Sequence, residues 1–169
     1  MKDFKNALLY RGFHCHENGD KFITIDDMKV KGSWIVGYLH LTNGLAFITP
    51  YDLKVTFLPE HATLLSPAVA VIKDTVSMAT GVYDDFDLPQ MIFQNDVVRY
   101  DDGNVSFEGR VVFELGSFGI ATDENIPIKS ISDNFVSFCE MIVNQEYVDD
   151  YHSVEYVTVI GKIWREENA

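Results

Sequence analysis

The segment from Phe93 to Ile120 (FQNDVVRYDDGNVSFEGRVVFELGSFGI) constrains the fold of this 169-residue chain more than any other part of it. Runs such as Val97–Tyr100 and Val105–Phe107 alternate with the period of two that strands require. Residues 101–104 between them are Asp-Asp-Gly-Asn, which favour a turn because they tolerate positive φ. Short β-forming runs with turns at intervals of roughly eight to twelve residues indicate a small barrel or sandwich.

Three glycines subdivide the end of this segment. Gly109 stands between two β-forming runs and predicts a bulge or a sharp bend. Gly116 and Gly119 flank Ser117-Phe118 and predict another turn. We interpret the whole segment as the kernel of the barrel, a scaffold that carries no chemistry of its own.

The N-terminal part of the chain contains two Asn-Gly pairs, which are strong hairpin signals. Asn18-Gly19 follows a first β-forming run, and Asn43-Gly44 lies between the strands predicted at Ser33–Leu41 and Leu45–Thr49. The charged stretch Asp26–Gly32 is predicted to be a loop. The fold class is therefore mainly β, with a β-rich region over residues 1–72 and a small barrel over residues 73–169.

One helix is expected near residues 133–146. Ser132 or Asp133 is placed to cap it, and apolar residues follow at helical spacing on one face. These residues are Phe135, Phe138, Cys139 and Ile142. Val154–Trp164 is predicted as the last strand; because it is apolar on both sides, it should lie centrally or close the barrel.

The net charge of −13 argues against direct nucleic-acid binding, because phosphate attraction supplies most non-specific affinity. The same charge leaves open an acidic surface that imitates a phosphate backbone, although solvated acids are the more ordinary interpretation. No apolar run approaches the roughly 20 residues that span a bilayer. We expect a cytoplasmic protein of a bacterial host, with no membrane association, and with Cys15 and Cys139 reduced.

Metal binding is the best-formed chemical hypothesis, and it is a weak one. On a strand, His14 and His16 share a face while Cys15 points the other way. A zinc site usually needs four ligands, so further ones would have to complete it, at no diagnostic spacing. The available residues are His40, His61, His152 and Cys139. The alternative is a polar strand end beside a turn.

Other polar groups have more ordinary explanations. Asp84, Asp85 and Asp87 lack the pattern of an EF-hand loop and are expected to form a solvated acidic loop. Asp149-Asp150 with His152 is expected to be a helix end and a turn, and Cys139 is expected to pack in the core. Five aromatic residues suggest a binding surface, although strand aromatics are more often buried. They are Trp34, Tyr38, Tyr100, Phe118 and Trp164.

Three motifs follow one another along the chain: Tyr10-Arg11-Gly12, Trp34 to Leu39 (Trp-x-x-Gly-x-Leu) and Val159 to Glu166. In this order they resemble the opening motif, the Trp-x-x-Gly-x-Leu motif and the closing segment of the YopX family of bacterial phages and prophages. Asp74 to Asp84 and Asn95 to Val98 match two further segments, whereas the Lys-Asp-x-Asn-Gly-Lys turn of the family is replaced here. The resemblance implies a C-terminal SH3-type barrel, a phage origin and homo-oligomerisation. It implies no activity and supplies no functional residues.

Three functional hypotheses follow. The first is a non-enzymatic phage or prophage accessory protein that self-assembles through sheet edges or binds a host protein. The second is a DNA mimic that inhibits a host nucleic-acid-binding protein. The third and weakest is a metal-dependent enzyme built around His14 and His16. We expect no catalytic residues, no cofactor-binding residues and no cofactor.

Overall fold

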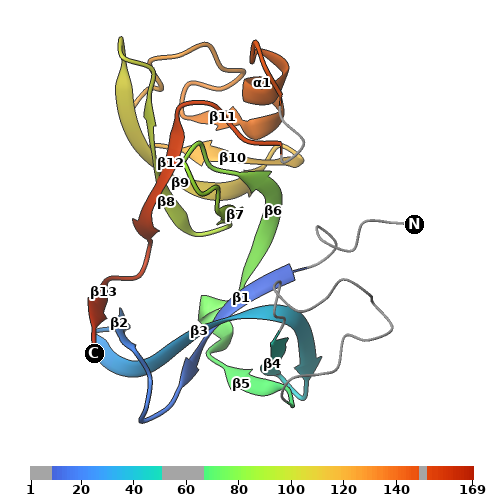
Figure 1. Cartoon of the computed structure of the whole chain (residues 1–169), viewed down its shortest axis with the longest axis vertical. Coiled ribbons are helices and arrows are strands. Elements are labelled where there is room, and N and C mark those ends of the chain that lie inside the picture. The colour runs from blue at the N-terminus through green and yellow to red at the C-terminus, as the bar shows by residue number, and fades with distance from the viewer. Residues whose placement is uncertain (1–8, 51–66, 149–151) are drawn as a thin grey trace. The chain divides into compact units, whose positions relative to one another are not determined.

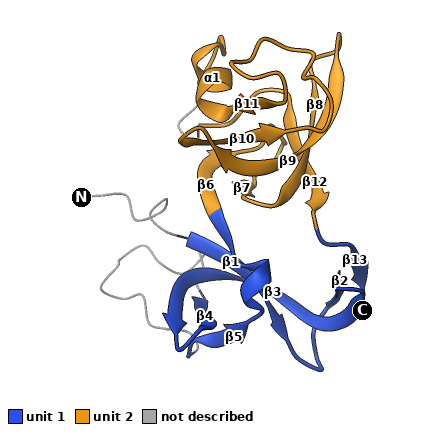
Figure 2. Ribbon diagram, turned by 180° about the vertical axis from the view of Figure 1, so that it is seen from behind, with its two compact units in different colours: residues 1–78, 164–169 blue, residues 79–163 orange. Residues whose placement is uncertain are grey.

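The structure is a computed structural model that describes residues 9–50, 67–148 and 152–169. Within these ranges the protein is mainly β, with two antiparallel sheets (Figure 1). The chain divides into two compact units (Figure 2). Unit 1 comprises residues 1–78 and 164–169, and unit 2 comprises residues 79–163. The sequence suggested one division, after residue 72; the structure divides the chain after Met78 and returns the last six residues to unit 1.

Unit 1 is organised around one long strand, β3 (Met28–Thr42). It pairs with β2 (Lys21–Ile25) along its first part, with β1 (Leu9–Cys15) along its middle and with β4 (Leu45–Pro50) at its end. Shorter strands extend this sheet: β13 (Glu166–Asn168) pairs with β2, β5 (Val69–Val71) with β4, and the first residues of β6 (Ser77–Tyr83) with β1. The rest of β6 and its partner β7 (Met91–Phe93) belong to unit 2. A 3-10 turn, η2 (Lys73–Thr75), leads into β6.

Of the three connections predicted for the first part of unit 1, the structure confirms one hairpin and corrects the other two. Asn43 and Gly44 have φ of 51° and 77° and join β3 to β4 in a two-residue hairpin, which confirms that prediction. The loop prediction for residues 26–32 was wrong, because Asp26 and Asp27 take positive φ and form an equally tight turn between β2 and β3. The hairpin at residues 18–19 was also wrong, because β1 and β2 both pair with β3 and not with each other.

Unit 2 contains an antiparallel meander of β8 (Asp96–Asp101), β9 (Ser106–Glu114) and β10 (Ser117–Ala121), so the kernel does consist of strands and turns. The full order of this sheet is β11-β10-β9-β8-β12. Its two edge strands are β11 (Phe135–Ser137) and β12 (Val157–Lys162). In the described part of the chain this ladder does not close.

The glycines of the kernel act differently from the prediction. β9 runs through Gly109 without a bulge, and a Cβ atom there would lie 2.5 Å from Ile120 Cγ2. Gly109 therefore permits close approach of β10, which is the other reason for a glycine within a strand. The turn predicted between Gly116 and Gly119 lies earlier in the structure, at Leu115-Gly116, where φ is 51° and 78°. Gly119 lies inside β10.

The helix is much shorter than predicted: α1 spans Phe138–Val143. Residues 135–137 form β11 instead, paired with Gly119–Ala121 of β10. The cap is Ser137 and neither Ser132 nor Asp133. Its side chain accepts from the Glu140 N–H at 3.0 Å, and the Glu140 carboxylate accepts from the Ser137 N–H at 2.8 Å, which together form a capping box.

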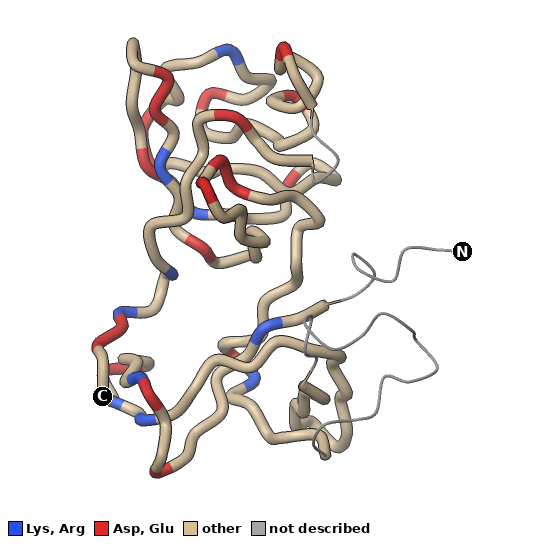
Figure 3. The backbone as a smooth tube through the Cα atoms, in the orientation of Figure 1, with Lys and Arg blue, Asp and Glu red and all other residues tan. Residues whose placement is uncertain are grey.

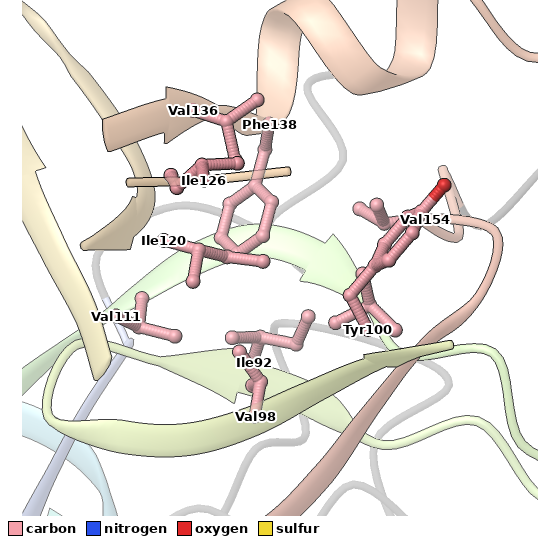
Figure 4. Close-up of a cluster of buried hydrophobic side chains, with 10 residues drawn as sticks. Ile92, Val98, Tyr100, Val111, Ile120, Ile126, Val136, Phe138 and Val154 are labelled. Atoms are coloured by element: carbon pink, nitrogen blue, oxygen red, sulfur yellow. The ribbon is translucent and has the colours of Figure 1, made fainter. Parts of the chain in front are cut away.

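The core of unit 2 lies between the meander and α1. Figure 4 shows Ile92, Val111, Ile120 and Phe138 converging on one another, and all are at most 2% exposed. β12 is an edge strand with Ile160 43% exposed, which corrects the prediction of a central or closing strand. The apolar composition of β12 therefore does not mean that both of its faces are buried.

Candidate functional site

His14 lies in β1 and His16 directly follows the end of that strand, and their rings stack with centroids 5.0 Å apart. Each ring is held by its own partner: His14 Nδ1 contacts the Ala70 carbonyl at 2.7 Å, and His16 Nε2 contacts Ser33 Oγ at 3.0 Å. Across residues 9–50, 67–148 and 152–169, no group of three or more His, Cys, Asp or Glu residues is placed to hold a metal ion. His61 lies outside the described residues.

Three segments that carry the family resemblance meet within unit 1. The Arg11 guanidinium lies over the Trp34 ring at 5.2 Å, and the Trp34 and Trp164 rings are 5.6 Å apart. Trp34 Nε1 also donates to Glu166 Oε1. Gly12 allows β1 to approach β5, because a Cβ atom there would lie 2.9 Å from Val71 Cγ2. These motif residues thus hold distant parts of the first sheet together.

The acidic loop at residues 84–90 is not uniformly solvated, contrary to the prediction. Asp84 is fully buried, and its carboxylate accepts from the backbone N–H groups of Gln90 and Val159 at 2.9 and 3.1 Å. Asp85 donates its N–H to the Val157 carbonyl and accepts from the Tyr156 N–H. The loop therefore covers the outer edge of β12, which limits strand addition there.

A pocket of about 270 Å³ opens beside α1 in unit 2. The Tyr100 and Tyr156 rings contribute to its wall at 73° to each other, with centroids 5.9 Å apart. Glu155 also lines it, and Met141 and Val136 supply apolar wall. We call it the tyrosine pocket. The contact between Tyr100 and Tyr156 could not be predicted from their spacing in the sequence, because β8 and β12 become neighbours only in the folded sheet.

Tyr100 reaches from the core to this pocket. Its hydroxyl donates to Asp102 Oδ2 at 3.0 Å. Burial, and then this hydrogen bond to a carboxylate, raises the pKa of Tyr100 to about 12, so the hydroxyl keeps its proton. The Asp102 carboxylate also accepts from the backbone N–H groups of Val105 and Asn104, which lowers its pKa.

Exposed apolar side chains surround the other side of α1. Ile131 and Val143 are both 82% exposed and share a hollow of about 470 Å³ with Cys139. We call Ile131, Cys139 and Val143 the α1 patch. Cys139 is exposed, so the prediction that it packs in the core was wrong; with helix starting at residue 138, its side chain turns outward. The hollow at the α1 patch and the tyrosine pocket share three lining residues: Lys129, Glu140 and Asn144.

The β9–β10 hairpin also carries exposed apolar side chains. Ser117 Oγ lies 3.8 Å from Cys139 Sγ, and Phe113 and Phe118 on the hairpin contact each other at 5.0 Å. Phe113 is 55% exposed, and Leu115 at the turn is 76% exposed. Such a gathering of exposed apolar side chains is typical of surfaces that bind other molecules.

The five aromatic residues proposed as one surface are divided between the two units. Trp34, Tyr38 and Trp164 belong to unit 1, and Tyr100 and Phe118 belong to unit 2. Tyr100 is 8% exposed and contributes to the core as well as to the pocket. His152 is exposed with φ of 53°, and Asp149-Asp150 lies outside the described residues.

The negative charge belongs almost entirely to unit 2. Residues 79–163 contain 16 acidic and 4 basic side chains, a net of −12, whereas unit 1 contains 10 acidic and 9 basic, a net of −1. Figure 3 shows the acidic positions of unit 2 on several strands and loops. The α1 patch and the tyrosine pocket are therefore parts of a strongly anionic unit.

Comparison of the chain with protein-family models, curated proteins and solved structures finds no match. Among the described residues, no helix has both the length and the apolar character needed to cross a membrane.

Proposed function

We propose that this chain is a non-enzymatic accessory protein of a phage or prophage that acts by binding other proteins. The observation that carries the proposal is the α1 patch, where Ile131 and Val143 are each 82% exposed around a hollow. Exposing such apolar groups to water is unfavourable unless a partner covers them. The resemblance of the ordered motifs to the YopX family supports the phage origin, and an SH3-type barrel for unit 2 remains the fold it implies.

The side-chain surface is a better candidate for contact than the sheet edges. Edge strands such as β7, β11 and β13 are three residues long, and short edges discourage pairing between molecules. The outer edge of β12 is occupied by Asp84 and Asp85. We therefore assign binding, whether to a host protein or to a second copy, to the surface beside α1.

Three of the polar groups considered for chemistry, His14, His16 and Asp84, have structural partners, which supports a binding role. His14 and His16 contact Ala70 and Ser33, and Asp84 fixes a loop to β12. General acid–base catalysis needs groups free to exchange protons with a substrate in a shared cleft. These side chains are committed to the fold instead.

The test is affinity capture from a lysate of a bacterial host, with the wild-type chain and with Val143→Asp. A partner that binds through the α1 patch should be lost with Val143→Asp. Leu88→Asp is the matched control, because Leu88 is 83% exposed in the acidic loop and Val143 is 82% exposed. The proposal is contradicted if both variants retain the same proteins as the wild type, or if the wild type captures none.

A second candidate function is DNA mimicry, which the concentration of net charge −12 in unit 2 favours. Several of these acids are nevertheless used internally: Asp84 and Asp96 are buried, and Glu140 caps α1. A mimic should displace duplex DNA from a host DNA-binding protein with a steep salt dependence. Failure to compete with DNA at low salt would exclude this candidate.

A further inference from the structure

The tyrosine pocket has features that a hydrophobic docking surface alone does not need. We propose that it binds a lysine or arginine side chain of a basic partner segment that lies across the α1 patch. This inference rests on the proposed function and names the chemistry of the partner. The two sites are continuous, because Lys129, Glu140 and Asn144 line both.

The aromatic walls provide the first argument. Tyr100 and Tyr156 both line the pocket, with their rings at 73° and centroids 5.9 Å apart, so a side chain that enters it meets an aromatic wall. A cation within about 6 Å of an aromatic face is stabilised by the ring quadrupole. Tyr100 is held in place by its hydrogen bond to Asp102 and by stacking on Phe107 at 5.2 Å. The pocket wall is thus preorganised.

The charges provide the second argument. Glu155 lines the pocket, and within the described residues its carboxylate makes no hydrogen bond or ion pair. Glu140 is also anionic, although its oxygens accept from the Ile131 and Ser137 N–H groups. Among the described residues that line the pocket, Lys129 is the one basic side chain, so the two carboxylates outnumber it. A positively charged side chain gains more here than a neutral or negative one.

The net charge of unit 2 decides between the possible occupants. A second copy docked by the same surface would bring together two units of net charge −12, which repel each other. A basic segment with apolar residues is attracted by the same charge and covers Ile131 and Val143. We therefore assign the surface to a basic amphipathic segment of another protein and not to self-association.

The test uses the full chain, isotope-labelled for NMR, and three blocked peptides. The first contains leucine and lysine, the second has each lysine replaced by norleucine, and the third has each lysine replaced by glutamate. The lysine peptide should shift the ring resonances of Tyr100 and Tyr156 and the backbone amides of α1 in a saturable way. The norleucine peptide should bind more weakly and the glutamate peptide should not bind.

Matched variants separate the pocket from general electrostatics. Glu155→Gln and Tyr156→Leu should each lower the affinity for the lysine peptide by roughly fivefold, which corresponds to about 1 kcal/mol of binding free energy. Glu124→Gln removes the same charge from an exposed turn that does not line the pocket, and should change the affinity by less than about twofold. Equal weakening by Glu155→Gln and Glu124→Gln would overturn the proposal.

The outcomes also distinguish this inference from the proposed function. If the lysine and norleucine peptides shift α1 amides equally and leave both tyrosines unchanged, the cation site is wrong while a protein-binding patch remains. If no peptide binds and the chain instead self-associates through the amides of α1, the assignment to a basic partner is wrong. Preference for the glutamate peptide would contradict it directly.

Discussion

Single buried polar residues decide much of unit 2. Asp84 fixes the acidic loop to β12. Tyr100 belongs to the core and also lines the pocket, and its hydroxyl donates a hydrogen bond to Asp102. Asp84 stands in an acidic stretch typical of the surface, and Tyr100 stands in a β-forming run typical of the core. The hydrogen bonds that these residues make could not be predicted from either pattern. Their contributions are measurable by substitutions that change one bond at a time.

Asp84→Asn should lower the free energy of unfolding by about 1–3 kcal/mol. The amide group retains the shape of the carboxylate but places a donor beside the N–H groups of Gln90 and Val159, which need acceptors. Urea unfolding measures the loss. Asp87→Asn, in the exposed part of the same loop, is the control and should leave stability nearly unchanged. Equal effects of the two substitutions would show that the buried carboxylate contributes nothing.

Tyr100 should give stability a dependence on alkaline pH. Because folding raises its pKa from 10.0 to about 12, the folded state holds the proton more tightly than the unfolded state. This contribution is fully present below about pH 10 and is lost as the pH rises through about 12. The stability advantage of the wild type over Tyr100→Phe should therefore shrink across that window, in chemical unfolding at a series of pH values. Tyr147→Phe, at a 72% exposed position, should follow the wild-type profile.

At the scale of elements, two turns were predicted correctly, whereas the extent of the helix was not. Asn43-Gly44 and the Asp-Asp-Gly-Asn turn could be identified because their chemistry is local: Gly103 has φ of 87°, and Asp101 and Asp102 accept N–H groups two or three residues ahead. The start of the helix could not be predicted, because residues 135–137 can either extend α1 or pair with β10. The free edge of β10 favours the strand.

The position of the helix cap is directly testable. Ser137→Ala should destabilise unit 2 by about 0.5–2 kcal/mol, because the Glu140 N–H loses its acceptor. Asp133→Ala removes one of the two residues that the sequence offered as the cap, and should have little effect, since the cap of α1 is Ser137. Thermal unfolding followed by far-UV circular dichroism compares the two. A larger effect of Asp133→Ala would mean that the helix begins earlier.

At the scale of the whole molecule, the two units differ in how the chain builds them. Unit 2 is one continuous segment, 79–163, whereas unit 1 needs residues 164–169 to return to it. β13 pairs with β2, and Trp164 contacts Trp34. Both tryptophans of the chain therefore belong to unit 1, which makes tryptophan fluorescence a selective probe of that unit.

Truncation after Ile163 should destabilise unit 1 and leave unit 2 folded. The loss removes the β13 ladder, the Trp164 ring contact and the Glu166 acceptor of Trp34. We expect a lower unfolding temperature by Trp34 fluorescence, and an unchanged resonance spectrum for residues 79–163. The fragment 79–163 should also fold when expressed alone. An unfolded fragment would contradict the division into two units.

The sequence by itself determined the β class, the kernel strands and the turns at Asn43-Gly44 and residues 101–104, because alternation and positive-φ residues act within a few positions. The tertiary structure decided the burial of Asp84, the exposure of Cys139, the pairing of β12 at an edge and the approach of Tyr100 to Tyr156. These features depend on which segments become neighbours across the sheets, and local patterns carry no information about that choice. The surface proposed to bind partners belongs to this second group.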